Sequence, residues 1–204
     1  MIECTGLNGS DALSFIDDLA ELRCQVFREY PYLYEGDLGY EREYLAHYSE
    51  SEYSFLVIAK FENQIIGVST CLPLVEADPA FQQPFMEAGY DMAKIGYFGE
   101  SVLLPEFRGH GVGHRFFDLR EQWAQKHHFT ITTFCSVIRP DDHASRPLNY
   151  RSHDEFWKKR GYQRHDELIA KLNWPEVSDT EKSSNPDIAD ETPHSLVFWL
   201  KSTL

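Results

Sequence analysis

The chain has 204 residues, of which 42% are hydrophobic and 14% aromatic, a composition that supplies a folded core and excludes a wholly disordered chain. Its 33 acidic residues outnumber 19 basic ones and leave a net charge of −14, which repels nucleic acids and anionic membranes. We therefore expect a single folded domain over residues 1–204, with neither of these as a partner.

The four cysteines show no C-x-x-C pairing and no histidine spacing of a zinc site, so we interpret them as buried thiols in a reducing compartment. They are Cys4, Cys24, Cys71 and Cys135. No apolar run approaches the roughly 18 residues that span a bilayer, and the first residues do not resemble a secretion signal. The sequence thus predicts a cytoplasmic protein. No metal is expected, because His110 and His114 lie in a glycine-rich segment without the adjacent glutamate of a zinc-protease helix.

Apolar spacing and turn residues predict the elements in chain order. After a first strand they are helices over 10–27 and 41–48, strands over 53–61, 64–74 and 95–104, a helix over 112–128, a strand over 129–138, a helix over 152–160, and strands over 162–174 and 195–201. Arg23 falls within the apolar spacing of the first helix. Two segments interrupt the pattern: 76–94, which contains prolines, and 175–194, whose acidic composition predicts a mobile loop.

A loop with three glycines, Gly109, Gly111 and Gly113, joins the strand over 95–104 to the next helix. Without Cβ atoms the backbone turns sharply, approaches a ligand closely and aims several N–H groups at one point, and the helix adds its positive end there. A Walker loop would need Lys-Ser or Lys-Thr where His114 follows, and a dinucleotide fingerprint would need G-x-G-x-x-G. A glycine turn without a ligand is the remaining alternative.

The segment Arg108-Gly-His-Gly-Val-Gly113, preceded by Leu-Pro-Glu-Phe, resembles the R/Q-x-x-G-x-G/A signature of the GNAT superfamily of N-acetyltransferases. The stretch Phe156-Trp-Lys-Lys-Arg-Gly-Tyr162 resembles the family's second signature, and the order of elements is that of the GNAT fold. The resemblance implies an α/β fold with a mixed, mostly antiparallel sheet of six to seven strands and about four flanking helices. The sheet would splay between the strand before the glycine loop and the next strand.

The resemblance also implies transfer of an acetyl group from the co-substrate acetyl-coenzyme A (acetyl-CoA) to a primary amine of a small molecule or peptide, directly within a ternary complex. The pyrophosphate would rest on the loop amides and the pantetheine arm beside the strand. The residues expected there are Val102, Leu103, Leu104, Arg108, Gly109, His110, Gly111, Val112, Gly113 and His114. The amide of Leu103 or a neighbour would donate to the thioester carbonyl. Arg108 would either contact phosphate or pin the loop.

An acceptor amine is protonated at neutral pH, so a base must remove a proton before attack. Glu100 is the expected base, directly or through water; its alternative role is a structural pair with a neighbouring cation. The family's tyrosine that protonates the leaving thiolate is replaced by Trp157, which leaves Tyr150 or water for that step. Cys135 is disfavoured as an acyl-enzyme nucleophile because no histidine is placed to activate it.

The aromatic, acidic loop over 30–37 would help select the acceptor, since Tyr32, Tyr34 and Glu35 offer aromatic faces and a carboxylate to an ammonium group; plain surface packing is the alternative. The apolar final strand would allow a homodimer by pairing over 196–200. Two other functions stay open. One is a non-catalytic sensor or partner module that binds coenzyme A, and the other is transfer of a longer acyl group.

Overall fold

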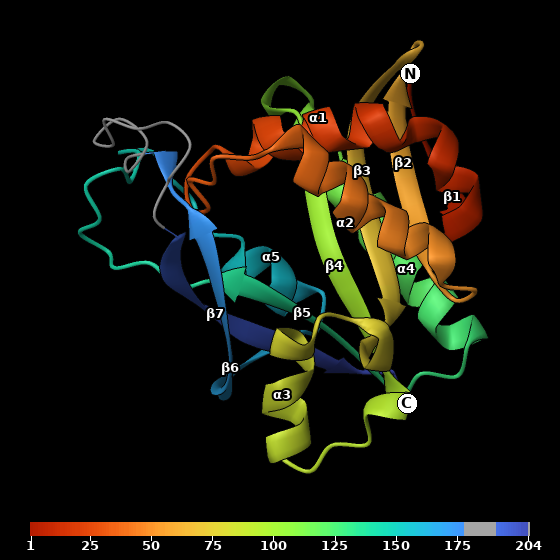
Figure 1. The fold of residues 1–204 in the computed structure, drawn as a ribbon, viewed down its shortest axis with the longest axis vertical. Helices are drawn as coiled ribbons and strands as arrows, with labels where there is room; N and C mark the ends of the chain where they lie inside the picture. Colours follow the sequence, from red (N-terminus) through yellow and green to blue (C-terminus); the bar gives the residue numbers. More distant parts are fainter. Residues whose placement is uncertain (178–190, 204) are drawn as a thin grey trace.

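The computed structural model describes residues 1–177 and 191–203 (Figure 1). Seven strands form one sheet in the order β1-β2-β3-β4-β5-β7-β6, and all neighbours are antiparallel except the parallel pair β4 and β5. The strands are β1 (Ile2–Asn8), β2 (Phe55–Phe61), β3 (Gln64–Pro73), β4 (Ile95–Leu103), β5 (Ile131–Val137), β6 (Gln163–Pro175) and β7 (Glu191–Ser202). The helices are α1 (Ile16–Phe27), α2 (Leu38–Glu50), α3 (Pro79–Glu87), α4 (Val112–Lys126) and α5 (Asp154–Lys159). The predicted mixed, mostly antiparallel α/β sheet is confirmed.

Helices cover both faces of the sheet. In Figure 1, α1 and α2 cross one face of β2, β3 and β4, while α4 lies behind the same strands. The apolar spacing of α4 is confirmed, since Val112, Phe116 and Trp123 are all buried. A second buried cluster, made largely of aromatic side chains, includes Phe117 from α4 and Phe134 from β5. α4 is thus anchored along its length, which fixes the loop at its N-terminus.

The sheet opens between β4 and β5. The two strands pair only where Ile95–Tyr97 meets Ile131–Thr133, although β4 continues to Leu103 and β5 to Val137. Beyond that short ladder the facing edges of the strands make no pairs with one another. The predicted splay is therefore confirmed, and it leaves backbone groups of β4 directed into the opening.

Several element boundaries differ from those expected. A 3-10 helix over Gly9–Phe15 precedes α1, because the backbone tightens before the buried turn begins. β7 starts at Glu191 and β6 runs to Pro175, so the ends of the segment expected as a loop are strand; its residues 178–190 lie outside the described part. The expected strand pairing across a dimer is wrong, because residues 196–200 pair with β5 on one edge and β6 on the other.

Two further expectations concern the environment of the chain. All four cysteines are free thiols, but only Cys71 is fully buried and the other three are half-buried, so the expectation of four buried thiols is correct for one. Within residues 1–177 and 191–203, no helix combines the length and apolarity that a membrane crossing demands. The cytoplasmic location stays a prediction.

Candidate active site

The loop between β4 and α4 depends on two glycines in the left-handed region. Gly109 has φ +81° and Gly111 has φ +82°, conformations that side chains with a Cβ rarely adopt. Gly111 is the N-cap of α4 and offers no side chain to cap it. The helix ladder begins with Arg115 N donating to Gly111 O (3.2 Å), so the amides before Arg115 point out of the helix end without an intrahelical partner. This arrangement can receive an anion.

The first turn of α4 is also suited to an anion by its charge. Acidic residues are favoured at a helix N-terminus, yet this turn contains none and carries His114 and Arg115 instead. The third glycine, Gly113, is not demanded by the protein's own packing, because a Cβ there would lie at an ordinary 3.7 Å from the Phe156 ring. A positive helix end with exposed amides and basic neighbours favours a phosphate.

The Arg108 side chain is engaged within the protein. Its Nε donates to Leu103 O (3.1 Å), and its Nη1 pairs with Glu29 Oε2 (2.8 Å). Arg108 therefore ties the glycine loop to the end of β4 and to the segment after α1. The guanidinium is 43% exposed, so its expected contact with phosphate stays a prediction beside this observed pinning role.

The end of β4 offers a backbone donor to the opening. Leu104 N donates to Ile66 O of β3 (2.9 Å). Because successive N–H groups of a strand point to opposite edges, that of Leu103 is directed toward β5, where the sheet is splayed. The side chains of Val102 and Leu104 are buried in the core. Of the three residues expected to hold the pantetheine arm, Leu103 is thus the one whose backbone N–H is directed into the opening, while Val102 and Leu104 pack in the core.

A β-bulge directs Glu100. Ser69 and Ser101 are opposed in the β3–β4 ladder, as are Cys71 and Phe98, so β4 has one residue more than β3 between these pairs. An extra residue changes the face to which the following side chains point. The bulge contains Gly99, where a Cβ would lie only 2.4 Å from the Tyr48 hydroxyl and 2.7 Å from Thr70 Oγ1. Glycine at this position allows the strand to bulge beneath α2.

The Glu100 carboxylate lies in a buried ion cluster beneath α1 and α2. Arg23 Nη1 is 2.7 Å from Glu100 Oε1, and Arg23 Nε pairs with Glu41. The guanidinium lies 4.3 Å from the Tyr44 ring, whose hydroxyl donates to Glu100 Oε2 (3.3 Å). One guanidinium faces two carboxylates, so the cluster carries one uncompensated negative charge. Glu100 therefore does form an ion pair with a neighbouring cation, as its alternative, structural role would require, and that cation is Arg23.

Tyrosine phenols surround this cluster and hold their protons at neutral pH. Burial, followed by the nearby Glu100 carboxylate, raises the pKa of Tyr44 and of Tyr48. Burial, followed by the charges of Cys135 and Glu100, raises the pKa of Tyr32. The pKa of Tyr97 is also raised by burial and by Cys135.

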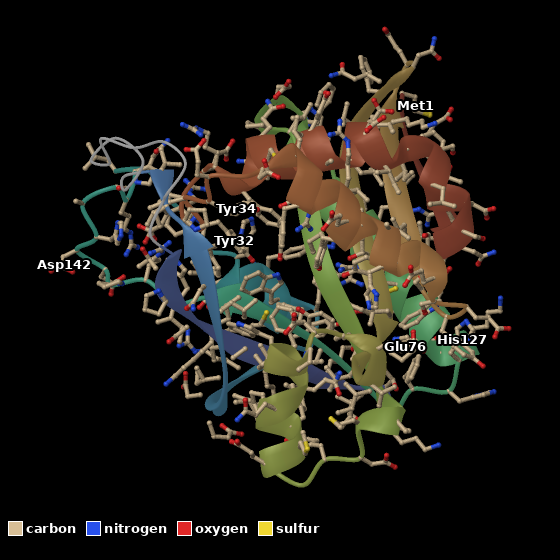
Figure 2. All side chains as sticks on the ribbon, viewed as in Figure 1. Met1, Tyr32, Tyr34, Glu76, His127 and Asp142 are labelled. Carbon is tan, nitrogen blue, oxygen red and sulfur yellow. The ribbon has the colours of Figure 1, made fainter. Side chains whose placement is uncertain are left out.

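The expected acceptor residues divide between this cluster and the surface. Tyr32 and Tyr34 lie beyond the end of α1 (Figure 2), and burial together with the Glu41 carboxylate raises the pKa of Tyr34. Glu35 pairs with Arg28 at the surface instead. Arg139 holds the aromatic loop over 30–37 in place, because it donates hydrogen bonds to Pro31 O (2.7 Å) and Tyr32 O (2.9 Å).

The other expected catalytic residue, Tyr150, lies on the segment after β5. Its ring packs edge-on against Tyr30 with centroids 4.7 Å apart. Burial raises the pKa of Tyr150, and Tyr150 in turn contributes to the raised pKa of Tyr32. Tyr150 therefore packs against the aromatic loop over 30–37. Among the described residues no hydrogen bond joins Tyr150 to Glu100, so the role of Tyr150 as proton donor stays a prediction.

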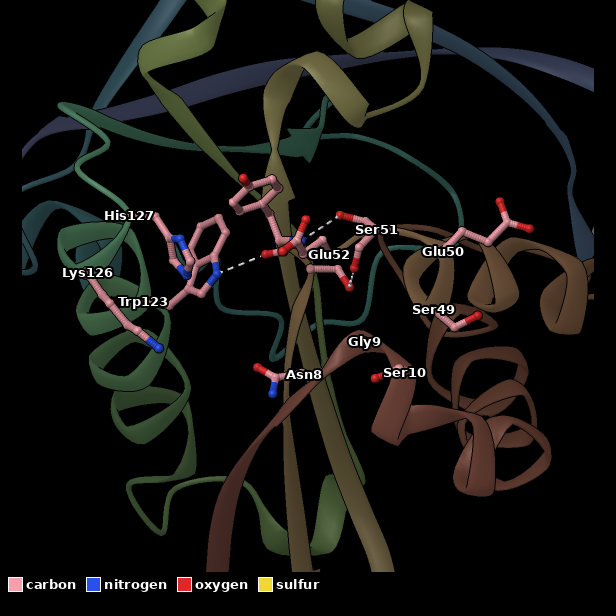
Figure 3. A pocket seen from close by; sticks show the side chains of 12 residues that line it. Asn8, Gly9, Ser10, Ser49, Glu50, Ser51, Glu52, Trp123, Lys126 and His127 are labelled. Atoms are coloured by element: carbon pink, nitrogen blue, oxygen red, sulfur yellow. Dashed lines mark hydrogen bonds between the residues drawn. The ribbon is translucent and has the colours of Figure 1, made fainter.

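Two hollows flank α4. One, of about 370 Å³, adjoins the glycine loop and is lined in part by His110, Gly111 and Arg115. The other, of about 410 Å³, lies at the opposite end of the helix, where Trp123 and His127 face the end of β1 and the turn that leads into β2 (Figure 3). A 15-residue helix is about 22 Å long, so this second hollow is remote from the glycine loop. It contains none of the expected site residues.

Sequence reasoning did not assign a role to Arg23, Glu41, Tyr44, Tyr48 or Tyr97. One signal was present: Arg23 occupies an apolar position of α1, and Glu41 precedes buried positions of α2. A charged residue within an apolar stripe is rarely buried unless it is paired. No group of three or more metal-ligating side chains occurs among residues 1–177 and 191–203, and the expected absence of a metal stays a prediction.

A sheet that splays beside a glycine loop suited to an anion is the arrangement of acyltransferases that take their acyl group from a coenzyme A thioester. The family model described as the acetyltransferase (GNAT) family matches residues 16–162, which is more than half of the chain. The chain therefore belongs to the GNAT acetyltransferase family. No curated protein sequence matches it.

Solved structures share its fold at low identity. The N-acetyltransferase from Staphylococcus aureus Mu50 is 9% identical, with a TM-score of 0.58 over 100% of this chain and 99% of that one. The ribosomal-protein-alanine N-acetyltransferase from Brucella melitensis is 12% identical, with a TM-score of 0.56 over 99% of each chain. A suspected acetyltransferase from Salmonella typhimurium, determined with its cofactor acetyl-CoA, is 10% identical, with a TM-score of 0.56 over 100% and 95%. These likenesses concern the fold alone.

Proposed function

We propose that the protein transfers an acetyl group from acetyl-CoA to a primary amine, directly within a ternary complex. The observation that carries the proposal is the short β4–β5 ladder, which ends at Tyr97. Beyond it lies the unpaired part of β4 that contains Glu100, and the chain then leads through the glycine loop to the uncapped N-terminus of α4. A pantetheine arm bears amides that pair with free strand backbone, and a pyrophosphate suits the exposed amides of the loop. Both ends of acetyl-CoA therefore find matching groups along one line.

The proton steps fall to residues near the opening. Acetyl-CoA, when bound, supplies a thioester carbonyl that the Leu103 amide is directed to polarise. Glu100 takes a proton from the acceptor ammonium, directly or through water. Because Arg23 is shared with Glu41, the cluster keeps one negative charge with which to accept that proton. After attack the nitrogen gives up its second proton to solvent, the carbon–sulfur bond breaks, and Tyr150 or water donates a proton to the leaving thiolate.

The acceptor belongs to the small-molecule or peptide amines. Tyr32 and Tyr34 border the carboxylate cluster and offer aromatic faces to an ammonium group. Direct transfer is favoured over an acyl-enzyme because burial raises the pKa of the Cys135 thiol to about 12, which keeps this thiol protonated. We infer a cytoplasmic enzyme, in keeping with four free thiols.

A coenzyme A-binding sensor is the second candidate. It is favoured by the pairing of Glu100 with Arg23 and by Trp157, which stands where the family has its acid. The Trp157 ring packs 5.0 Å from Phe134 and 5.1 Å from Trp199, so it serves the aromatic cluster and has no proton to give to a thiolate. A sensor would bind acetyl-CoA and release no thiol.

Thermal unfolding with and without acetyl-CoA tests the binding step. Ligand at about 100 times its dissociation constant adds roughly 2.7 kcal/mol, which corresponds to about 5–11 °C for a domain of this size. Amine-dependent release of free thiol then tests turnover. A shift with turnover supports the enzyme, a shift without turnover for any amine favours the sensor, and no shift at millimolar ligand contradicts both.

A further inference from the structure

Arg120 is a buried cation without a carboxylate partner among the described residues. It lies on α4 and is 2% exposed, and its guanidinium lies 4.5 Å from the Phe98 ring and 4.8 Å from the Phe117 ring. Burial lowers its pKa to about 10, so the group stays charged at neutral pH. Burying a charge without a counter-ion is costly unless its donors are satisfied. The retention of Arg120 therefore requires a reason beyond packing.

The hydrogen bonds of Arg120 lead to the β4 bulge. Its Nη1 donates to Glu100 O (3.3 Å) and Thr70 O (3.4 Å), and its Nε donates to Phe116 O (3.3 Å). Thr70 lies between the ladder pairs where β4 gains its extra residue. A bulge interrupts the ladder and leaves backbone groups without their strand partners. Arg120 thus donates hydrogen bonds to carbonyl groups at the bulge, where the regular β3–β4 pairing is interrupted.

Glu100 is consequently held at three points. Arg120 binds its carbonyl oxygen from the α4 face, and Arg23 binds its carboxylate from the α1 face (2.7 Å). Between them, Glu100 N donates to Thr70 Oγ1 (3.3 Å). Without a fixed bulge, the strand would revert toward a regular pleat, in which one residue's shift sends a side chain to the opposite face. The direction of the carboxylate therefore depends on a contact from behind the sheet.

We propose that Arg120 is a positioning residue, which fixes the β4 bulge and thereby holds the Glu100 carboxylate toward the opening. The catalytic half of this statement rests on the proposed function of Glu100 as base. α4 begins at the glycine loop and carries Arg120 two turns later. One helix would therefore position both the loop amides proposed to bind an anion and the Glu100 carboxylate.

Three variants test the role of Arg120. Arg120→Met keeps much of the side-chain volume and removes every donor, whereas Arg120→Lys keeps the charge and loses the fork. Arg160→Met is the matched control, because the Arg160 guanidinium also lies over Phe117 (5.0 Å) but pairs with Asp118 and Glu121 and reaches no β4 carbonyl. This control is used only for hydrogen exchange and thermal unfolding, because Arg160 also contacts His114, which follows the glycine loop.

Hydrogen exchange of the backbone amides over 98–102 is the first readout, measured beside thermal unfolding. Arg120→Met is expected to speed exchange there by about tenfold beyond any change in the rest of the sheet, and Arg120→Lys by less. Arg160→Met should show no excess in this segment. Equal effects of Arg120→Met and Arg160→Met, or no excess over the rest of the sheet, would overturn the proposal. If Arg120→Met does not fold, Arg120→Lys carries the comparison.

Kinetics is the second readout, using acetyl-CoA and the first amine that supports thiol release. Arg120→Met is expected to lower kcat by about tenfold or more while KM for acetyl-CoA changes by less than about threefold, and Arg120→Lys should recover part of kcat. A loosened bulge with unchanged kcat would overturn the link to Glu100. Exchange needs no turnover, so an inactive wild-type protein would refute the proposed function and leave the exchange result to decide the bulge.

Discussion

Replacing Gly111 by alanine separates backbone strain from ligand contact. At φ +82° a side chain with a Cβ costs on the order of 1 kcal/mol, and the new Cβ meets no atom within 4 Å that would add a clash. The free energy of unfolding should therefore fall by about 1 kcal/mol, which lowers Tm by about 2–4 °C. Affinity for acetyl-CoA should fall by about tenfold or more, because the methyl group enters the space through which a phosphate reaches the loop amides.

Two other glycines provide the controls for this variant. Gly89 follows α3, has φ +76°, and likewise has nothing within 4 Å of an added Cβ, so Gly89→Ala should cost the same stability and leave acetyl-CoA affinity unaltered. Gly113 lies in α4 outside the left-handed region, so Gly113→Ala should raise stability, by at most about 1 kcal/mol. Thermal unfolding gives the stabilities and titration calorimetry gives the affinities. Equal acetyl-CoA affinity in Gly111→Ala and Gly89→Ala would refute the assignment of the loop.

Three further outcomes follow from particular contacts. If Arg108 only holds the loop through Glu29 and Leu103, then Arg108→Gln and Glu29→Gln should weaken acetyl-CoA binding in calorimetry without changing its dependence on salt, whereas a weaker salt dependence for Arg108→Gln alone shows a phosphate contact. With a thiol pKa of about 12, Cys135 should be about 1 part in 10⁴ thiolate at pH 8 and should resist alkylation by iodoacetamide. The Cys135→Ala variant should still release the coenzyme A thiol from acetyl-CoA when an amine is added, and loss of that release would contradict direct transfer. Arg23→Met leaves the Glu100 and Glu41 carboxylates without their buried cation and should lower the free energy of unfolding by about 3–5 kcal/mol; an unchanged free energy of unfolding would contradict this pairing.

Local sequence signals were sufficient for the glycine loop and α4. Backbone conformation at Gly111 and the apolar spacing of Val112, Phe116 and Trp123 are decided within a few residues, so a pattern read along the chain predicts them. The splay between β4 and β5 followed from the family resemblance. Its geometry depends on which strands become neighbours in the sheet, and that is not encoded in any single segment.

The bulge and the ion cluster depend on contacts between distant segments. Arg23 and Glu100 are 77 residues apart, and nothing near either residue identifies the other as its partner. The extra residue in β4 is defined only by its register against β3, which the spacing of apolar residues does not reveal. Arg23 alone gave a warning, because it is a charge at a buried helical position.

Amine-dependent release of free thiol from acetyl-CoA, measured for wild type and Glu100→Gln, tests the central claim most directly. Glu100→Gln removes the carboxylate and leaves Arg23 paired with Glu41, so the fold and acetyl-CoA binding should persist. The account predicts release that requires an amine and falls by about tenfold or more in Glu100→Gln, at unchanged acetyl-CoA affinity. Thiol release that is equal in the two proteins would contradict Glu100 as the base, and binding without release for any amine would contradict the enzyme.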